Sequence, residues 1–361
     1  MDERLAYVCF GAFPGIGPLR FKSLLAVFGT AVKAWSADVD QLRQSGLGPI
    51  IIQKLIEFRQ SFDPVEYSKK LSQQEIRIVT RLDHEYPTLL KEILDPPIAL
   101  FVKGTLPQDY SRAIAIVGTR KPTPYGREIS QMLVEELTQA GCTIVSGLAR
   151  GVDAIAHRTT LMHKGMTLAV LGCGVDIVYP PEHKELYTQI IQKGGAIISE
   201  AVPGHTVIKG LFPQRNRIIS GLSRGVVVTE GAKDSGSLIT ARFAAEQGRD
   251  VFAVPGPVTS YLSEGPVKLI QEGARVVTRA QDILEELGIN GRQMKNAAVD
   301  VSRSETENKI LTLLQNGACH IDDIVRGSGL EPQTAAATLS ILELSGIIQN
   351  LGDGMFCRRK N

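Results

Sequence analysis

The sequence predicts an α/β protein whose mostly parallel sheet is covered by helices on both faces. Short β-branched runs, such as residues 113–117 and 226–228, end repeatedly at glycine-rich polar turns. Amphipathic helical patterns lie between these runs, for example at residues 125–140 and 151–163. Strands that alternate with helices join by right-handed crossovers into a parallel sheet. The turns therefore gather at one edge of that sheet, where its strands have their carboxyl ends.

The composition argues against several classes of protein. The 361 residues suffice for two or three domains. A formal net charge of +2 gives no general attraction for nucleic acid, so a polyanion site requires local clusters of cations. The five cysteines are far apart, which argues against disulfides and zinc and for a reducing cytoplasm. No run of about 18 apolar residues occurs, and Gly11 and Pro14 interrupt the N-terminal apolar stretch, so we expect neither a membrane span nor a secretory signal.

Residues 1–62 are predicted to form a small helical domain with two related turns. Phe-Pro-Gly-Ile-Gly-Pro at 13–18 and Gly-Leu-Gly-Pro at 46–49 each precede an apolar-periodic helix. Helix-hairpin-helix modules use such turns to hold phosphate with backbone N–H groups. We favour the alternative, in which glycine only permits a tight turn between helices, because few cations flank the two turns. These cations are Arg20, Lys22 and Lys54.

The other predicted boundaries follow from composition and periodicity. Residues 63–287 form the α/β domain, and the strands at 76–80 and 95–104 are expected to be antiparallel edge strands. Residues 288–303 are polar and patternless, which predicts a linker. Residues 304–361 show three short helices and a hairpin that turns at Gly352-Asp-Gly354, which is a winged-helix pattern. The third helix, from Pro332, contains no lysine or arginine, so duplex binding is not expected.

The turns at the ligand edge combine glycine and serine with fixed cations. The dinucleotide fingerprint is absent, because Gly172-Cys-Gly174 lacks the third glycine, so no nicotinamide or flavin cofactor is expected. Ser146-Gly147 and Ser235-Gly236-Ser237 precede helices, whose N-termini favour anions. The cations predicted to lie beside these turns are Arg120, Arg150, Lys184, Lys209, Arg215 and Arg217.

The segment 209–217 contains residue types that are suited to binding a single nucleic-acid strand. Arginine can hold phosphate oxygens in pairs, Asn216 can position a base edge, and the ring of Phe212 can stack on any base. We favour polyanion binding because three cationic turns reach the same edge of the sheet. The alternatives that stay open are a core position for Phe212, a helix cap for Asn216, and pairing of Arg215 with Glu200 or Glu230.

No catalytic residue or metal ligand is predicted at this edge. Asp153 and His157 lie four residues apart, share one helix face and can form a hydrogen bond. No nucleophile or leaving group is evident beside them, so we interpret His157 as structural. Cys173 has neither histidine nor lysine next to it in sequence, which argues against a reactive thiolate.

Six ordered motifs over residues 76–280 resemble the DNA-processing protein A (DprA, or Smf) family. The first three are Gly-Thr-Arg at 118–120, Ser-Gly-x-Ala-x-Gly-Val-Asp-x-x-Ala-His at 146–157, and Gly-x-Gly at 172–174 with Tyr-Pro at 179–180. The others are Phe-Pro-x-Arg-Asn-Arg-Ile-Ile-Ser-Gly at 212–221, Ser-Gly-Ser-Leu-Ile-Thr-Ala at 235–241, and Ala-Glu-Gln-Gly-Arg-Asp-Val-Phe-Ala-Val-Pro-Gly at 245–256.

The resemblance implies an extended Rossmann-like domain that binds single-stranded DNA without sequence preference. It also implies a cytoplasmic homodimer that helps to load the RecA recombinase during natural transformation, when competent cells take up DNA. DNA contacts are implied for Arg120, the turn at 172–174, Lys209 and Phe212, and, as in some members of the family, for Lys184. For the dimer interface we expect the apolar patterns at 251–287.

Two other functions compete with this one. Nucleoside-monophosphate phosphoribohydrolases have a similar edge, with Pro-Gly-Gly-x-Gly-Thr and a catalytic glutamate. The corresponding turn here, residues 233–240, has isoleucine and threonine where the acid would stand, so we expect no enzyme and no cofactor. A mononucleotide sensor, in contrast, would bind mononucleotides as tightly as oligonucleotides.

Overall fold

The computed structural model describes residues 1–206, 211–289, 305–314, 317–344, 347–352 and 354–358. The chain divides into two compact units, Met1–Gln293 and Met294–Asn361. Within the described ranges, no helix combines the length and the apolar character needed to cross a membrane.

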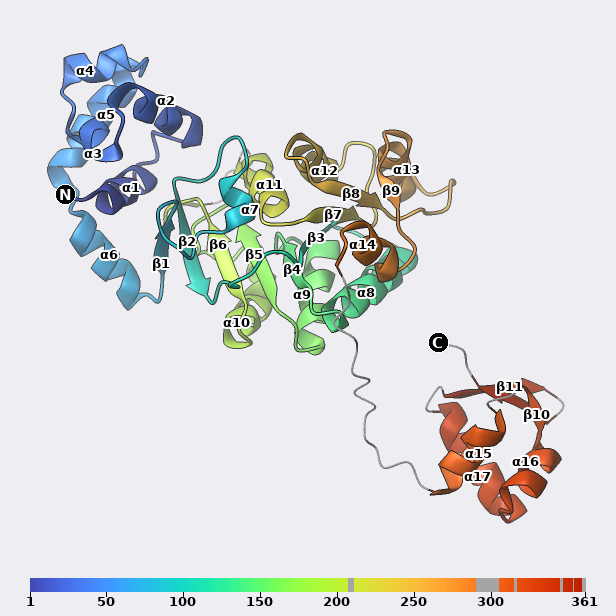
Figure 1. The fold of residues 1–361 in the computed structure, drawn as a ribbon. Coiled ribbons are helices and arrows are strands. Elements are labelled where there is room, and N and C mark those ends of the chain that lie inside the picture. Colours follow the sequence, from blue (N-terminus) through green and yellow to red (C-terminus); the bar gives the residue numbers. More distant parts are fainter. Residues whose placement is uncertain (207–210, 290–304, 315–316, 345–346, 353, 359–361) are drawn as a thin grey trace. The chain divides into compact units, whose positions relative to one another are not determined.

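The first unit begins with a group of helices, here called the N-terminal helices (Figure 1). They are α1 (Glu3–Ala12), α2 (Pro18–Phe28), α3 (Ala31–Ser36), α4 (Val39–Gln44), α5 (Pro49–Ser61) and α6 (Pro64–Gln73). Helices α1 to α5 share an apolar core, in which Phe10 contacts the rings of Phe21 and Trp35. Both α2 and α5 start with proline directly after a glycine, a position at which the missing N–H of proline is not needed.

A nine-stranded sheet follows, in the order β1-β2-β6-β5-β4-β3-β7-β8-β9. The strands are β1 (Arg77–Thr80), β2 (Ala99–Gly104), β3 (Ala113–Val117), β4 (Thr143–Ser146), β5 (Thr167–Leu171), β6 (Ala196–Ser199), β7 (Gly225–Val228), β8 (Asp250–Ala253) and β9 (Arg275–Val276). Strands β3 to β9 pair in parallel, whereas β1 and β2 are added antiparallel beside β6. The predicted mostly parallel sheet is thereby confirmed.

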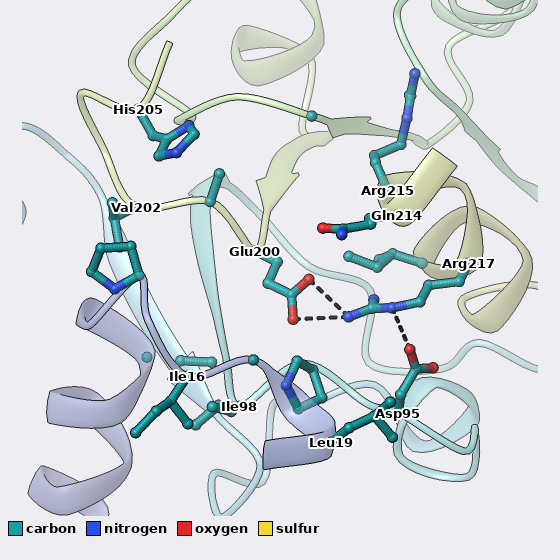
Figure 2. Close-up of a pocket in the computed structure, with 18 of the residues that line it drawn as sticks. Ile16, Leu19, Asp95, Ile98, Glu200, Val202, His205, Gln214, Arg215 and Arg217 are labelled. Atoms are coloured by element: carbon teal, nitrogen blue, oxygen red, sulfur yellow. Dashed lines mark hydrogen bonds and ion pairs between the residues drawn. The ribbon is translucent and has the colours of Figure 1, made fainter. Parts of the chain in front are cut away.

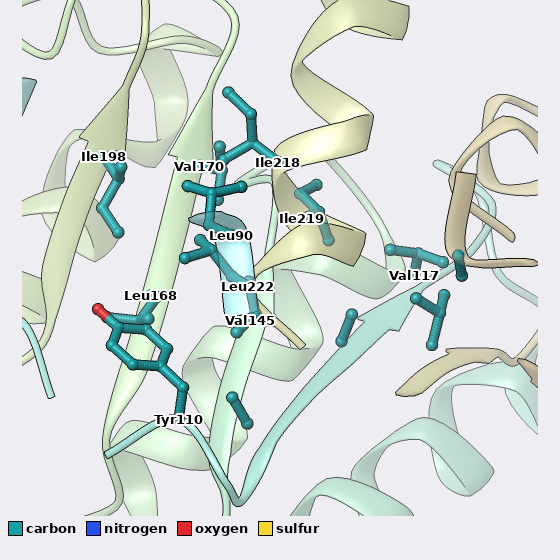
Figure 3. Packing of buried hydrophobic residues seen from close by; sticks show 14 of the residues in the cluster. Leu90, Tyr110, Val117, Val145, Leu168, Val170, Ile198, Ile218, Ile219 and Leu222 are labelled. Atoms are coloured by element: carbon teal, nitrogen blue, oxygen red, sulfur yellow. The ribbon is translucent and has the colours of Figure 1, made fainter. Parts of the chain in front are cut away.

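Helices cover both faces of the sheet, because its strands are apolar on both sides. In β3, Ala113, Ala115 and Val117 join one core, and Ile114 and Ile116 join the other. The first core, part of which Figure 3 shows, includes α7 (Thr88–Lys91), α11 (Leu211–Gly221), α12 (Gly236–Glu246) and α13 (Glu264–Gln271). On the other face lie α8 (Pro124–Gln139), α9 (Val152–Met162), α10 (Lys184–Gln192) and α14 (Ala280–Glu286). Two short 3-10 turns, η1 (Pro181–His183) and η2 (Tyr261–Ser263), precede α10 and α13.

The second unit is a winged helix, as predicted. It contains α15 (Glu305–Leu313), β10 (Cys319–His320), α16 (Ile321–Ser328), α17 (Pro332–Leu344), β11 (Ile348–Gly352) and β12 (Met355–Arg358). The strand order is β10-β12-β11. Ile310, Ile324, Leu339 and Phe356 belong to the apolar core of this unit.

The order of the strands fixes the position of the ligand edge. Strands β4, β5 and β6 follow β3 on one side, and the chain then crosses to place β7 on the other side of β3. Ligands of open α/β sheets bind in the crevice beyond the carboxyl ends of the strands where the order reverses. In this protein that point lies between the turn after β3 and the turn after β7.

Candidate functional site

The turn after β3 presents Arg120 at the ligand edge. The backbone N–H of Thr119 donates to the carbonyl oxygen of Glu230 at 2.7 Å, and the carbonyl oxygen of Thr119 accepts from the N–H of Val152 at 3.2 Å. These bonds tie the turn to the turn after β7 and to the start of α9. Arg120 itself is exposed, so a fixed backbone carries an accessible cation.

The turn after β4 is held from inside by Asp153. The N–H groups of Gly147 and Ala149 donate to Oδ2 of Asp153 at 3.1 and 3.3 Å. The hydroxyl of Ser146 donates to the carbonyl oxygen of Ile116 at 2.7 Å. Ser146 and Gly147 were expected to hold an anion, but both are buried and these donors are occupied. They shape the turn that carries Arg150.

Arg215 lies beneath this turn and not on the surface. Its side chain is buried and donates to the carbonyl oxygen of Val170 at 2.6 Å, and a Cβ at Gly147 would overlap its guanidinium. Burial lowers the pKa of Arg215 and raises that of Asp153, while their mutual attraction opposes both shifts. Instead of contacting phosphate as expected, Arg215 positions the turn.

Arg217 is also buried, and it forms the ion pair with Glu200 that we had considered for Arg215. Only 5% of its side chain is exposed; Nε lies 2.9 Å from Asp95, and Nη2 donates to both carboxylate oxygens of Glu200 at 2.9 and 2.8 Å. Burial raises the pKa of Glu200, and the charge of Arg217 opposes this shift. Arg217 therefore holds α11 to the segments before β2 and after β6.

The other predicted site residues are divided between surface and interior. Arg150 is exposed and paired with Glu182, and Lys184 is exposed at the start of α10. At α12, Ser235 is the N-cap and accepts from the N–H of Ser237 at 3.4 Å. Gly236 is exposed, and its carbonyl oxygen accepts from the amide of Asn216 at 3.2 Å. Ser237 is buried.

Gly172 and Gly174 have different surroundings. Gly172 lines two cavities, described below. Gly174 is buried, and its N–H donates to the carbonyl oxygen of His205 at 2.9 Å. The predicted contact Lys209 lies outside the described residues, and only the backbone of Phe212 is described.

A small cavity of about 30 Å³ lies among the turns, lined in part by Arg120, Arg150, Gly172 and Tyr179. A larger cavity of about 650 Å³ extends from the Gly172 turn to the turn between α1 and α2 (Figure 2). Tyr179 was not assigned a role from the sequence, although an exposed aromatic ring at this edge can stack on a base. The signal was its place in the loop after β5, five residues beyond the Gly-x-Gly turn.

His157 is a structural histidine. Its Nδ1 lies 2.7 Å from the hydroxyl of Thr167, and its Nε2 accepts from the N–H of Leu148 at 3.3 Å. Burial lowers its pKa to about 3, with smaller contributions from His183 and Arg215. The expected partner Asp153 instead accepts from the backbone of the turn after β4.

The fold and its edge define a doubly wound α/β protein with cationic, glycine-rich turns and a winged helix. The model of the family described as DNA recombination-mediator protein A matches residues 77–288, and the model of the DprA winged helix domain matches residues 295–354. The chain belongs to this DprA family.

Similar sequences and similar solved structures support the assignment to this family. Protein Smf of Escherichia coli is 36% identical over 352 residues, which cover 93% of this chain and 94% of the relative. DNA processing protein DprA of Bacillus subtilis is 45% identical over 216 residues, 60% of this chain and 72% of the relative. The structure of DprA from Streptococcus pneumoniae matches with a TM-score of 0.67 and 36% identity, over 79% of this chain and 98% of that one.

A second solved structure matches over a smaller part of the chain. It is DNA processing protein A from Helicobacter pylori, whose study concerns a single-stranded DNA binding mode. The TM-score is 0.52 at 31% identity, over 59% of this chain and 95% of that one.

Proposed function

We propose that this protein binds single-stranded DNA, without sequence preference, at the carboxyl edge of its sheet. The observation that carries the proposal is that some of the cations at this edge are exposed, whereas others are buried. Arg120, Arg150 and Lys184 are exposed at the ends of fixed turns and helices, where phosphates can reach them. The relative from Helicobacter pylori, which is described as binding single-stranded DNA, supports the same ligand.

The function we propose is binding without catalysis and without a cofactor. Three acidic side chains near the edge are occupied by protein donors. Asp153 holds backbone N–H groups, Glu200 holds Arg217, and Glu230 accepts from the N–H and hydroxyl of Thr123 at 2.9 and 2.6 Å. A phosphoribohydrolase needs a carboxylate that faces the sugar, and this arrangement gives that alternative no support.

We further propose a cytoplasmic homodimer that loads RecA recombinase onto the bound strand during recombination and natural transformation. The description of the family as a recombination mediator supports this role. Dimerisation supports it physically, because two linked sites bind one strand with greater avidity than either site alone.

The test is a titration of the full-length protein with fluorescent oligo-dT, duplex DNA and AMP at several salt concentrations. We expect oligo-dT to bind most tightly. Arg120→Ala and Lys209→Ala should each weaken binding and reduce the slope of log affinity against log salt by about 0.7, because each removes one phosphate contact. Arg43→Ala, which removes an exposed arginine of α4, is the matched control and should change neither quantity. AMP binding as tight as oligo-dT binding would contradict the proposal and favour the mononucleotide sensor.

The variant Phe212→Ala separates the contribution of base stacking to DNA affinity from the contribution of phosphate contacts. A base stacked on an aromatic ring contributes on the order of 1–3 kcal/mol without releasing a counterion, so this variant should bind more weakly at an unchanged salt slope. The variant must have the same melting temperature as the wild type, so that a loss of binding does not reflect a loss of folding. Unchanged binding by a folded Phe212→Ala variant would remove the stacking role.

A further inference from the structure

The cavity of about 650 Å³ lies where the N-terminal helices meet the ligand edge (Figure 2). Its walls come from segments far apart in the sequence. These are residues 10–20, the approach to β2, the Gly172 turn, residues 200–205 after β6, and the helices α11 and α12. The volume falls within the range of roughly 300–1,000 Å³ that is usual for small-molecule sites.

The chemistry of this cavity suits a flat, uncharged ligand that can form hydrogen bonds. Ile16, Leu19, Ile98 and Val202 supply apolar surface. Arg217 pairs with both Asp95 and Glu200, so this group of three side chains keeps one negative charge. A phosphate would lie against these two carboxylates, whereas the N–H groups of a nucleobase can donate to them.

The polar groups on the wall have capacity for such a ligand. Gln214 is exposed and lies beside the Glu200–Arg217 pair (Figure 2). Each carboxylate oxygen of Glu200 accepts one bond from Arg217 and has a second acceptor position left.

The cavity is adjacent to the proposed strand site. Leu171, Gly172 and Arg215 line both this cavity and the small one that contains Arg120 and Arg150. A strand whose phosphates lie on these two exposed arginines would need only to pass the Gly172 turn to reach the larger cavity.

We propose that this cavity takes an unstacked nucleobase of the bound strand, so that the N-terminal helices form part of the single-strand site. The proposal rests on the single-stranded DNA binding proposed above. The apolar walls cover the faces of the base, and Glu200 and Gln214 meet its hydrogen-bonding edge. Every base carries an N–H donor on that edge, so this recognition is independent of sequence.

The chain contains an internal control for this role. Gly-Ile-Gly-Pro-Leu at 15–19 and Gly-Leu-Gly-Pro-Ile at 46–50 both lead into a helix that starts at proline. Leu19 is 58% exposed and lines the cavity. Ile50 occupies the same place in the second turn, is 71% exposed, and lines a separate groove formed by α4 and α5. Leu19→Ser and Ile50→Ser are thus matched substitutions of isomeric, exposed side chains.

The experiment compares both full-length variants on oligo-dT and on an abasic oligomer of equal length, after their melting temperatures have been matched to the wild type. We expect Leu19→Ser to weaken oligo-dT binding by roughly threefold to tenfold, and Ile50→Ser to leave it unchanged. On the abasic oligomer, which keeps the phosphates, both variants should bind like the wild type. An equal loss for Leu19→Ser on both oligomers, or an equal loss for both variants, would overturn the inference.

Two further results separate this inference from the proposed function. Oligo-dT that carries 4-thiothymine should cross-link under ultraviolet light to residues 10–20 or 200–206, and the absence of such cross-links would overturn the inference. If Leu19→Ser bound oligo-dT normally while Arg120→Ala bound it more weakly, the inference would also be overturned. The proposed strand site at the sheet edge would then still be supported. Failure of the wild type to bind oligo-dT would instead overturn both.

Discussion

At the scale of single residues, the arginines predicted to lie at the ligand edge have different tasks that the sequence alone did not separate. Arg120 and Arg150 are exposed, whereas Arg215 and Arg217 are buried. The segment 209–217 was interpreted without a helix, but α11 already begins at Leu211. Arg215, Ile218, Ile219 and Leu222 then follow a helical spacing of three, four and seven, and all four are buried. With the true start of the helix, periodicity would have predicted that Arg215 faces inward.

His157 provides a prediction about pH. Its pKa is about 3 in the folded protein and about 6.5 in an unfolded chain. Below pH 6.5 the unfolded chain binds a proton that the folded protein does not. Stability should therefore fall by about 1.4 kcal/mol per pH unit from this one group as the pH drops from about 6.5 towards 3.

The variant His157→Asn isolates this contribution from the neighbouring Asp153, whose raised pKa acts in the opposite direction. The variant loses buried hydrogen bonds and should be less stable at pH 7 by roughly 1–3 kcal/mol. Its denaturation midpoint should nevertheless fall less than that of the wild type between pH 7 and pH 5. If urea denaturation gave both proteins the same pH dependence, another group would be responsible.

At the scale of elements, the strands were easier to predict than the functions of the turns. Alternating β-branched runs and glycine turns placed β3 to β7 correctly, and the two antiparallel strands as well, although β2 lies between β1 and β6 and only β1 is at the edge. The anion site expected at Ser146-Gly147 failed for a specific reason. The helix starts only at Val152, and Asp153 in its first turn takes the N–H groups of the preceding turn. Ser235, directly before α12, is an N-cap as its spacing indicates.

The edge strand β9 is the element on which we test the proposed dimer. It ends the sheet opposite β1, and Val276 is 48% exposed there. Unpaired backbone and apolar side chains on an edge strand favour pairing with another chain, and lysine opposes it. Val276→Lys should shift the sedimentation of the protein from dimer to monomer at tens of micromolar. Val27→Lys, at a 52% exposed position on α2, should not. A monomeric wild type would contradict the dimer itself.

At the scale of the whole molecule, the class of each part followed from the sequence, but the contacts between distant segments did not. Ile98, just before β2, packs into the core of the N-terminal helices. The guanidinium of Arg4 in α1 donates to Asp83 at 2.6 Å, after β1. Local periodicity does not predict a contact between two residues that are 79 positions apart in the sequence. The cavity that joins these helices to the ligand edge depends on such contacts and therefore became visible only in the structure.

The winged-helix unit provides the last prediction, because its fold is one that commonly enters the major groove of DNA. The helix that would enter the groove, α17, has no lysine or arginine. In residues 304–361, seven aspartates and glutamates face five lysines and arginines, so the unit lacks the positive charge that phosphate contacts require. The fragment 304–361, which has its own apolar core, should remain folded and show no binding to a fluorescent duplex at physiological salt. Sub-micromolar duplex binding by the folded fragment would mean that this unit contacts DNA through elements other than α17.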